Sequence, residues 1–175
     1  MRTTKLIAAA FVVWTAAVMS AGQQAPAQTG AYTPPPAPEQ PLPYSHKTHL
    51  AQGLKCVECH QTVETDDHAT LPPTGICMGC HANAKTDSPN IQKLAQYDAK
   101  NEEVPWRRVY RLPEFVYRSH KQHVTDAKIT CDACHGNVPH LEVMQKVKDM
   151  SMPTCIECHK ERSARVTCDT CHEVQ

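Results

Sequence analysis

The stretch Cys131-Asp-Ala-Cys134-His135 decides the fold, because its C-x-x-C-H pattern occurs five times in this chain of 175 residues. We number the copies motifs 1 to 5 in chain order. Besides motif 3, quoted above, they are Cys56-Val-Glu-Cys59-His60, Cys77-Met-Gly-Cys80-His81, Cys155-Ile-Glu-Cys158-His159 and Cys168-Asp-Thr-Cys171-His172. Together the five copies use all ten cysteines.

Each motif has the spacing that covalent attachment of haem c needs. Two thiols three positions apart can form thioethers with the two vinyl groups of one porphyrin, and the next imidazole then reaches the iron. The sequence therefore predicts five covalent haems c. The thioether residues are Cys56, Cys59, Cys77, Cys80, Cys131, Cys134, Cys155, Cys158, Cys168 and Cys171, and the proximal iron ligands are His60, His81, His135, His159 and His172. A zinc or disulfide protein is the alternative, but neither explains a histidine after every C-x-x-C pair.

Composition limits the size of the protein core. The chain is 41% hydrophobic but only 5% aromatic, so five haems would have to supply much of the apolar mass. We expect a mostly irregular and α-helical fold, with short helices and loops wrapped around the haems. The formal net charge is zero and there is no basic block, which argues against a nucleic-acid partner.

An internal repeat divides the chain. Ser45-His-Lys-Thr-His-Leu50 returns as Ser119-His-Lys-Gln-His-Val124, and each copy precedes two motifs, with motif 5 appended. The repeat predicts two dihaem modules and a C-terminal haem. The expected boundaries within a pentahaem domain of residues 44–175 are 44–81 for the first module, 82–116 for a helix and strap, 117–159 for the second module and 160–175 for the fifth haem.

The repeated H-x-x-H pairs are candidate distal ligands. Residues three apart share one face of a helix, yet their imidazoles can reach different irons. We therefore expect distal ligation by His46, His49, His120 and His123, the alternative being two ordinary surface pairs.

One iron would still need a distal ligand. The remaining histidines are His68, before motif 2, and His140, just after motif 3. A thioether from Met144, Met150 or Met152 could also serve, and methionine ligation would raise the reduction potential. The sequence leaves these alternatives open.

The segment between the modules carries no motif. Ser88 and Pro89 have the pattern of an N-cap and first helical residue, which predicts a helix from Pro89 to about Asn101. Residues 104–117 should form an extended strap. We expect its aromatic residues to pack on haem faces and its arginines to bind haem propionates; these are Trp106, Tyr110 and Phe115, and Arg107, Arg108, Arg111 and Arg118.

The N-terminus carries an export pattern. Residues 1–22 have a short basic start and an Ala-rich apolar run, which predicts a signal peptide or an N-terminal membrane anchor. Residues 23–43 are rich in proline and predict an extended, unpaired linker. The expected location is the periplasm, and an uncleaved N-terminal segment would anchor the chain to the outer face of the inner membrane.

The H-x-x-H pairs upstream of C-x-x-C-H resemble the class III multihaem cytochromes c. Residues 104–124, which lead into the second pair, are similar to the pentahaem subunit of alternative complex III and related quinol-oxidising membrane complexes. The resemblance implies a periplasmic electron wire whose partners are redox proteins, in particular other subunits of such a complex.

Ligation predicts the kind of chemistry. An iron with two protein ligands has no open position for substrate, so it exchanges electrons without bond chemistry. We therefore predict electron transfer rather than catalysis. The alternatives are a soluble periplasmic shuttle and a multihaem reductase of a small oxyanion, which would need a five-coordinate haem.

Overall fold

The computed structural model describes residues 31–172 as short helices joined by long irregular segments. The helices are α1 (His46–Leu50), α2 (Cys56–Cys59), α3 (Thr74–His81), α4 (Pro89–Ala99), the π-helix η1 (Lys121–Asp126), α5 (Cys131–His135), the 3-10 helix η2 (Val138–His140), α6 (Met152–Glu161) and α7 (Cys168–Cys171). The described residues contain no strand and only one isolated bridge, between Val116 and His172. This confirms the predicted fold class.

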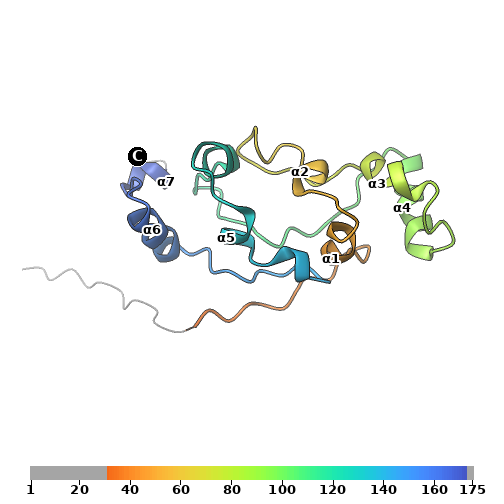
Figure 1. Ribbon diagram of the computed structural model, residues 1–175, viewed down its shortest axis with the longest axis horizontal. Coiled ribbons are helices and arrows are strands. Elements are labelled where there is room, and N and C mark those ends of the chain that lie inside the picture. Colours follow the sequence, from red (N-terminus) through yellow and green to blue (C-terminus); the bar gives the residue numbers. More distant parts are fainter. Residues whose placement is uncertain (1–30, 173–175) are drawn as a thin grey trace, which may run out of the picture.

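The molecule is elongated. Helices α3 and α4 lie at one end and α6 and α7 at the other, with α1, α2 and α5 between them (Figure 1). Each motif lies on its own short helix: α2, α3, α5, α6 and α7 carry motifs 1 to 5 in that order. The cysteines of a motif are therefore one helical turn apart, which brings both thiols to the same side.

Both H-x-x-H pairs follow a serine cap. The hydroxyl of Ser45 accepts a hydrogen bond from the Thr48 amide at 3.0 Å, and that of Ser119 accepts one from the Gln122 amide at 3.1 Å. The first pair lies on α1, as predicted. The second differs, because the turn continues as the π-helix η1, in which the Ala127 amide reaches back five residues to the Gln122 carbonyl at 2.9 Å. Single π-turns of this kind are frequent at functional sites.

The helix predicted between the modules is present. It is α4, with Ser88 as N-cap and Pro89 at its first position, and it packs on α3. Leu94 of α4 is buried with Leu42 and Val104, and this cluster also contacts Trp106, which we had expected near a haem. The strap of residues 104–117 is extended, as predicted, apart from one turn near Phe115.

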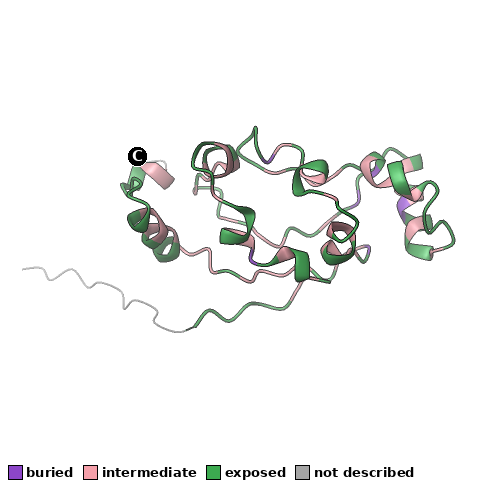
Figure 2. Cartoon of the chain, in the orientation of Figure 1, coloured by how far each residue is buried: buried purple, intermediate pink, exposed green. Residues whose placement is uncertain are grey.

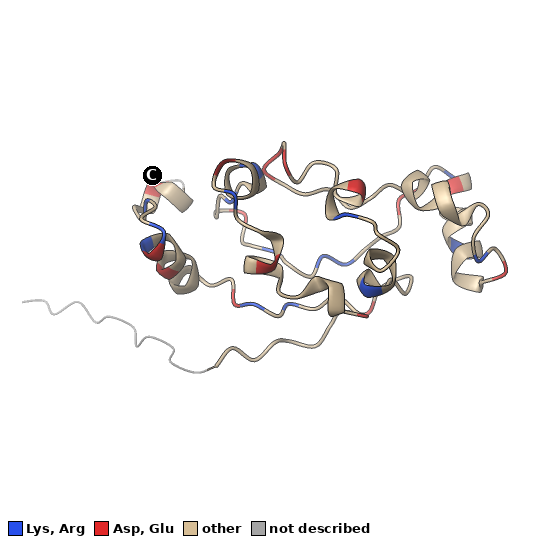
Figure 3. Ribbon diagram, viewed as in Figure 1, with Lys and Arg blue, Asp and Glu red and all other residues tan. Residues whose placement is uncertain are grey.

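The buried core is small. Among residues 31–172 the buried hydrophobic side chains are Leu42, Val63, Leu94 and Val104. Most of the ribbon is exposed or half-buried (Figure 2). Positive and negative side chains are both spread along the length of the molecule (Figure 3). The protein alone therefore has little apolar interior, as the low aromatic content predicted.

One prediction for the N-terminal segments is wrong. Residues 31–43 are extended, but they are not unpaired as predicted: the Gln40 side chain donates to the Arg107 carbonyl at 2.9 Å and accepts from the Arg107 amide at 3.0 Å. Burial of Leu42 in the core cluster explains why this part stays on the body. The predicted signal or anchor, residues 1–22, lies outside the described residues. Within residues 31–172 no helix is long and apolar enough to cross a membrane.

Gly136 provides a stability test next to motif 3. It caps α5 with φ +70°, and a Cβ at this position would collide with the Val147 side chain. We expect Gly136→Ala to destabilise the folded protein by about 1–3 kcal/mol, because a non-glycine residue is strained in this region. Gly75→Ala is the matched control, since a Cβ at Gly75 in α3 meets nothing within 4 Å. Denaturant unfolding of the haem-loaded protein, followed by circular dichroism, would measure both; equal stabilities would contradict the prediction.

Candidate metal centres

The proximal histidines share one arrangement. In four of the five motifs the ring Nδ1 donates to a backbone carbonyl: His60 to Thr70 at 2.8 Å, His81 to Ala84 at 3.0 Å, His159 to Arg165 at 2.6 Å and His172 to Phe115 at 3.1 Å. Because a carbonyl can only accept, these contacts place a proton on Nδ1, so Nε2 is the ring nitrogen left to bind a metal ion. Such a bond commonly orients a metal-bound histidine.

The second histidine of each H-x-x-H pair is oriented in the same way. His49 Nδ1 donates to the Ser45 carbonyl at 2.8 Å, and His123 Nδ1 donates to the Ser119 carbonyl at 2.7 Å. The serine that caps the turn thus also fixes the imidazole four residues later. The acceptor is a backbone carbonyl, which every residue has. Beyond the repeated serine, therefore, nothing in the sequence indicated this hydrogen bond.

Two histidine pairs face one another at the same separation. The ring centroids of His49 and His81 are 6.1 Å apart, and those of His123 and His159 are also 6.1 Å apart. A metal–imidazole bond is about 2 Å, so two rings bound to opposite sides of one metal ion have centroids roughly 6 Å apart. In both modules, therefore, the second H-x-x-H histidine and the second motif histidine have the spacing of two axial ligands.

His46 and His135 each have a buried ring nitrogen without a polar partner. Their Nδ1 atoms make no hydrogen bond within the described part of the chain. Burial, with smaller contributions from neighbouring charges, lowers the pKa of each ring to about 4. For His46 the first of those neighbours is His60 of motif 1. Both rings are therefore neutral near pH 7, which is the form that binds iron.

His120 is placed differently. Its Nδ1 donates to the Asp67 carbonyl at 3.0 Å, while its Nε2 accepts from the Arg118 guanidinium at 3.0 Å. Burial and then Arg118 lower the pKa of this ring. His120 and Arg118 line one cavity with Cys131, Cys134 and His135 of motif 3. Ligation by His120 thus requires the guanidinium of Arg118 to move off Nε2.

The structure does not choose the fifth distal ligand. His68 and His140 are both exposed, whereas the other nine histidines are half-buried. Neither ring makes a hydrogen bond, or an aromatic contact with a motif histidine, within residues 31–172. Among the methionines considered, Met152 is 61% exposed, and Met144 and Met150 are half-buried. These residues remain alternatives.

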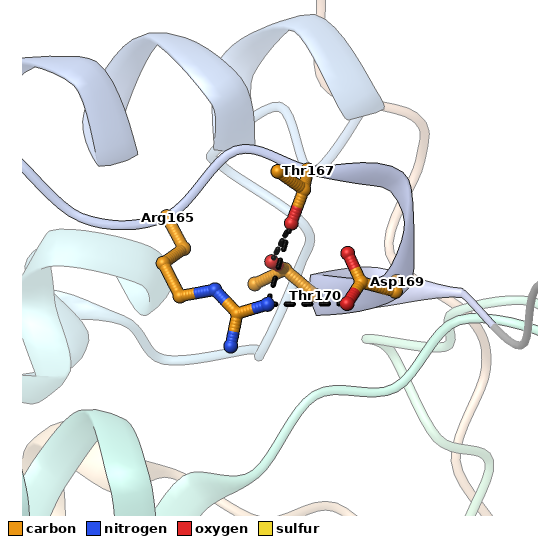
Figure 4. Close-up of polar contacts among 4 residues, drawn as sticks. All are labelled: Arg165, Thr167, Asp169 and Thr170. Carbon is orange, nitrogen blue, oxygen red and sulfur yellow. Dashed lines mark hydrogen bonds and ion pairs between the residues drawn. The ribbon is translucent and has the colours of Figure 1, made fainter.

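Motif 5 is held by a polar cluster of its own. Arg165 pairs with Asp169 at 3.1 Å, and the hydroxyls of Thr167 and Thr170 lie 2.9 Å apart (Figure 4). The hydrogen bond from Thr167 and the charge of Arg165 lower the pKa of the Asp169 carboxyl, so it is ionised at neutral pH. The cluster stabilises the one-turn helix α7 around its two cysteines.

The strap residues are distributed among the motifs. The Tyr110 ring packs edge-on to His135 at 4.6 Å, and Phe115 lies 5.8 Å from His172. Of the arginines, Arg118 contacts His120, as described, and Arg108 donates to the Ala69 carbonyl at 3.5 Å. Propionate binding by the arginines stays a prediction.

The cysteine geometry suits thioether formation. None of the ten cysteines is paired in a disulfide. Nowhere in residues 31–172 do three His, Cys, Asp or Glu side chains gather into one cluster that could hold a bare metal ion. Each motif instead presents two thiols on one helical turn beside one imidazole, which a backbone carbonyl orients in four of the five motifs. This arrangement fits a covalent porphyrin.

Comparison with known proteins agrees with this geometry. The family of cytochrome c7 and related cytochrome c matches residues 42–101 and 116–173. The first range holds the first H-x-x-H pair with motifs 1 and 2, and the second holds the other pair with motifs 3 to 5. The menaquinone reductase multiheme cytochrome c subunit of Nitratidesulfovibrio vulgaris is 30% identical over 165 residues, covering 77% of each chain. The predicted resemblance to multihaem cytochromes c is confirmed: this chain belongs to the cytochrome c7 and related cytochrome c family, whose members bind haem c covalently and transfer electrons.

Proposed function

We propose that this chain carries electrons through five haems c on the periplasmic side of a membrane, as a subunit of a complex that exchanges electrons with a quinone such as menaquinone. The observation that carries the proposal is the 30% identity to the menaquinone reductase subunit, because it extends over 77% of both chains. The similarity of residues 104–124 to quinol-oxidising complexes points the same way.

The residues that would hold each haem follow from combining the two ring pairs with the repeat. His49 and His81 would hold the haem of motif 2, and His123 and His159 that of motif 4, since each pair is 6.1 Å apart. By elimination within each module, His46 pairs with His60 at motif 1, and His120 pairs with His135 at motif 3. Motif 5 then has His172, with His68, His140 or a methionine on the other side.

The protein's own contribution is orientation and the exclusion of competing chemistry. Bound haem c supplies one-electron transfer at each site. In the folded protein, the carbonyl contacts of His49, His81 and the other oriented rings would fix the direction in which Nε2 points. Ligation on both sides closes the iron to substrates, which is why we favour electron transfer over reduction of a small oxyanion.

The domain boundaries are proposals of the same kind. Residues 44–81 and 117–159 would form the two dihaem modules, residues 82–116 the helix and strap between them, and residues 160–175 the fifth haem site. We propose that residues 1–22 export the chain or anchor it. Residues 23–43 would connect that segment to the body, ending at the Gln40–Arg107 contact.

The haem number is a prediction with a direct test. We expect the intact mass of the mature protein to exceed that of the polypeptide by five haem equivalents. Changing Cys168→Ala together with Cys171→Ala should lower this to four, because one porphyrin loses both thioethers. Mass spectrometry of denatured protein checks both values, since only covalent haem survives. Four equivalents in the unchanged protein would contradict the count of five.

Complex membership is tested by haem staining of a native gel. Detergent-solubilised membranes should show stain, and this chain, in one large assembly. The soluble periplasmic fraction, run beside it, is the control. Haem stain only in that fraction, at the size of the mature chain, would overturn the complex and leave the soluble shuttle.

A further inference from the structure

We propose that the five haem-attachment sites form one row in the order motif 2, motif 1, motif 3, motif 4, motif 5, so that α3 and α7 carry the two ends. The functional significance of this order rests on the proposed electron-transfer function. This order makes α3 and α7 the places where this chain meets its electron donor and acceptor. A row in sequence order would instead have put motif 1 at an end.

In the first module, the order of the two motifs along the row is the reverse of their order in the sequence. Helix α3 lies towards the end of the molecule that α4 closes, and α2 lies inward of it (Figure 1). Helix α1 lies below both in this view, and its His49 ring faces His81 of motif 2 at 6.1 Å (Figure 1). Tyr44 stacks on His49 at 4.4 Å and contacts His46 edge-on at 4.8 Å, so one aromatic ring lies beside both histidines of the pair.

Motif 1 is joined to the second module by a set of backbone contacts. The loop that follows motif 1 accepts three hydrogen bonds from the N-terminal part of the second module: His120 amide to Asp67 carbonyl at 3.0 Å, Lys121 amide to Asp66 carbonyl at 3.1 Å, and Thr125 hydroxyl to Glu64 carbonyl at 2.7 Å. These contacts place η1 against motif 1 rather than against motif 2.

A second set joins α1 to the chain after motif 3. The Lys47 amide donates to the Leu141 carbonyl at 3.1 Å, and both Ser45 and Lys47 bind the Glu142 carboxylate, at 2.7 Å and 2.9 Å. Motifs 1 and 3 are thus enclosed between two sets of contacts that cross the module boundary. The step between them is the only route from one module to the other that these contacts support in residues 31–172.

The far end of the row is built from α6 and α7. His123 of η1 faces His159 of motif 4 at 6.1 Å. Motif 5 is tied to the strap, where the Tyr117 amide donates to the Cys171 carbonyl at 2.8 Å and Val116 bridges His172.

The order can be measured as distances from a spin label. A nitroxide attached through Gln96→Cys on α4, or through Glu161→Cys on α6, gives one distance to each low-spin ferric haem by pulsed electron paramagnetic resonance. Both positions are exposed and lie outside the motifs. One haem at a time is then removed by changing both motif cysteines to alanine, Cys77 and Cys80 for motif 2 or Cys56 and Cys59 for motif 1.

From the α4 label, loss of the motif 2 haem should remove the shortest distance, and loss of the motif 1 haem the second shortest. From the α6 label, loss of the motif 2 haem should remove the longest distance. If loss of the motif 1 haem removes the shortest distance from α4, the order is wrong. These distances do not depend on any partner, so a failed native-gel test would leave them unchanged.

A variant that keeps all five haem-attachment motifs tests the order even if the variants that lack one motif do not mature. His49→Met should raise the potential of the motif 2 haem, which then becomes reduced, and diamagnetic, earlier on stepwise reduction than in the unchanged protein. Relative to that control, the shortest distance from α4 should vanish at a higher potential. Earlier loss of a longer distance in its place would contradict the order.

Discussion

Without covalent haem, the chain is expected to be largely unfolded. Its described part buries only four hydrophobic side chains, Leu42, Val63, Leu94 and Val104, and none of its side chains is less than 2% exposed. Chains that cannot bury enough apolar surface do not offset the conformational entropy of folding, roughly 1–2 kcal/mol per residue for the backbone alone. The nine described helices are 3 to 11 residues long, below the roughly 12 residues at which an isolated helix becomes even marginal.

The measurement compares the same chain with and without haem. Produced in a host that lacks cytochrome c maturation, with thiols kept reduced, it should show the circular dichroism of a disordered chain and a narrow proton spectrum. The haem-loaded protein is the control and should melt cooperatively. We expect α4 on α3 to be the region with most residual structure, because three of the four buried side chains gather there. A cooperative melt of the haem-free chain would show that the polypeptide folds alone.

Much of the architecture could be predicted because haem attachment depends on residues that are close together in the sequence. The C-x-x-C-H spacing and the repeated H-x-x-H pairs require only near neighbours in the chain, and the Ser88-Pro89 start predicted α4 correctly. The same local logic fails for contacts between distant segments. Nothing in the linker composition indicated that Gln40 pairs with Arg107, and nothing near His123 indicated a π-helix.

The ligand pairs show the same limit. Spacing identified His49 and His123 as candidates but could not say which motif each one faces, because that depends on how the chain turns back. In the structure, the ring centroids of His49 and His81 are 6.1 Å apart, and those of His123 and His159 are also 6.1 Å apart. The last distal ligand has no such repeat, since motif 5 stands outside the duplicated unit, and so neither spacing nor geometry selects it.

Replacing His49 or His123 by leucine is expected to convert one haem of five from low spin to high spin. Leucine fills a similar volume but offers no lone pair, so the iron across from His81 or His159 loses its second strong ligand. Electron paramagnetic resonance of the oxidised protein should show about a fifth of the low-spin signal replaced by a high-spin signal. The double variant should lose about two fifths, because the two pairs are in different modules and share no partner.

The matched controls are His68→Leu and His140→Leu, which change the two exposed histidines. At most one of them should reproduce the loss of a fifth, and the one that does identifies the distal ligand of motif 5. If neither does, a methionine holds that position, and the spectrum should then show a methionine-ligated haem at higher potential, within the roughly 0.8 V range that axial ligands control. An unchanged low-spin signal in both His49→Leu and His123→Leu would contradict the assigned pairs, because the 6.1 Å spacing would then be packing between rings rather than ligation.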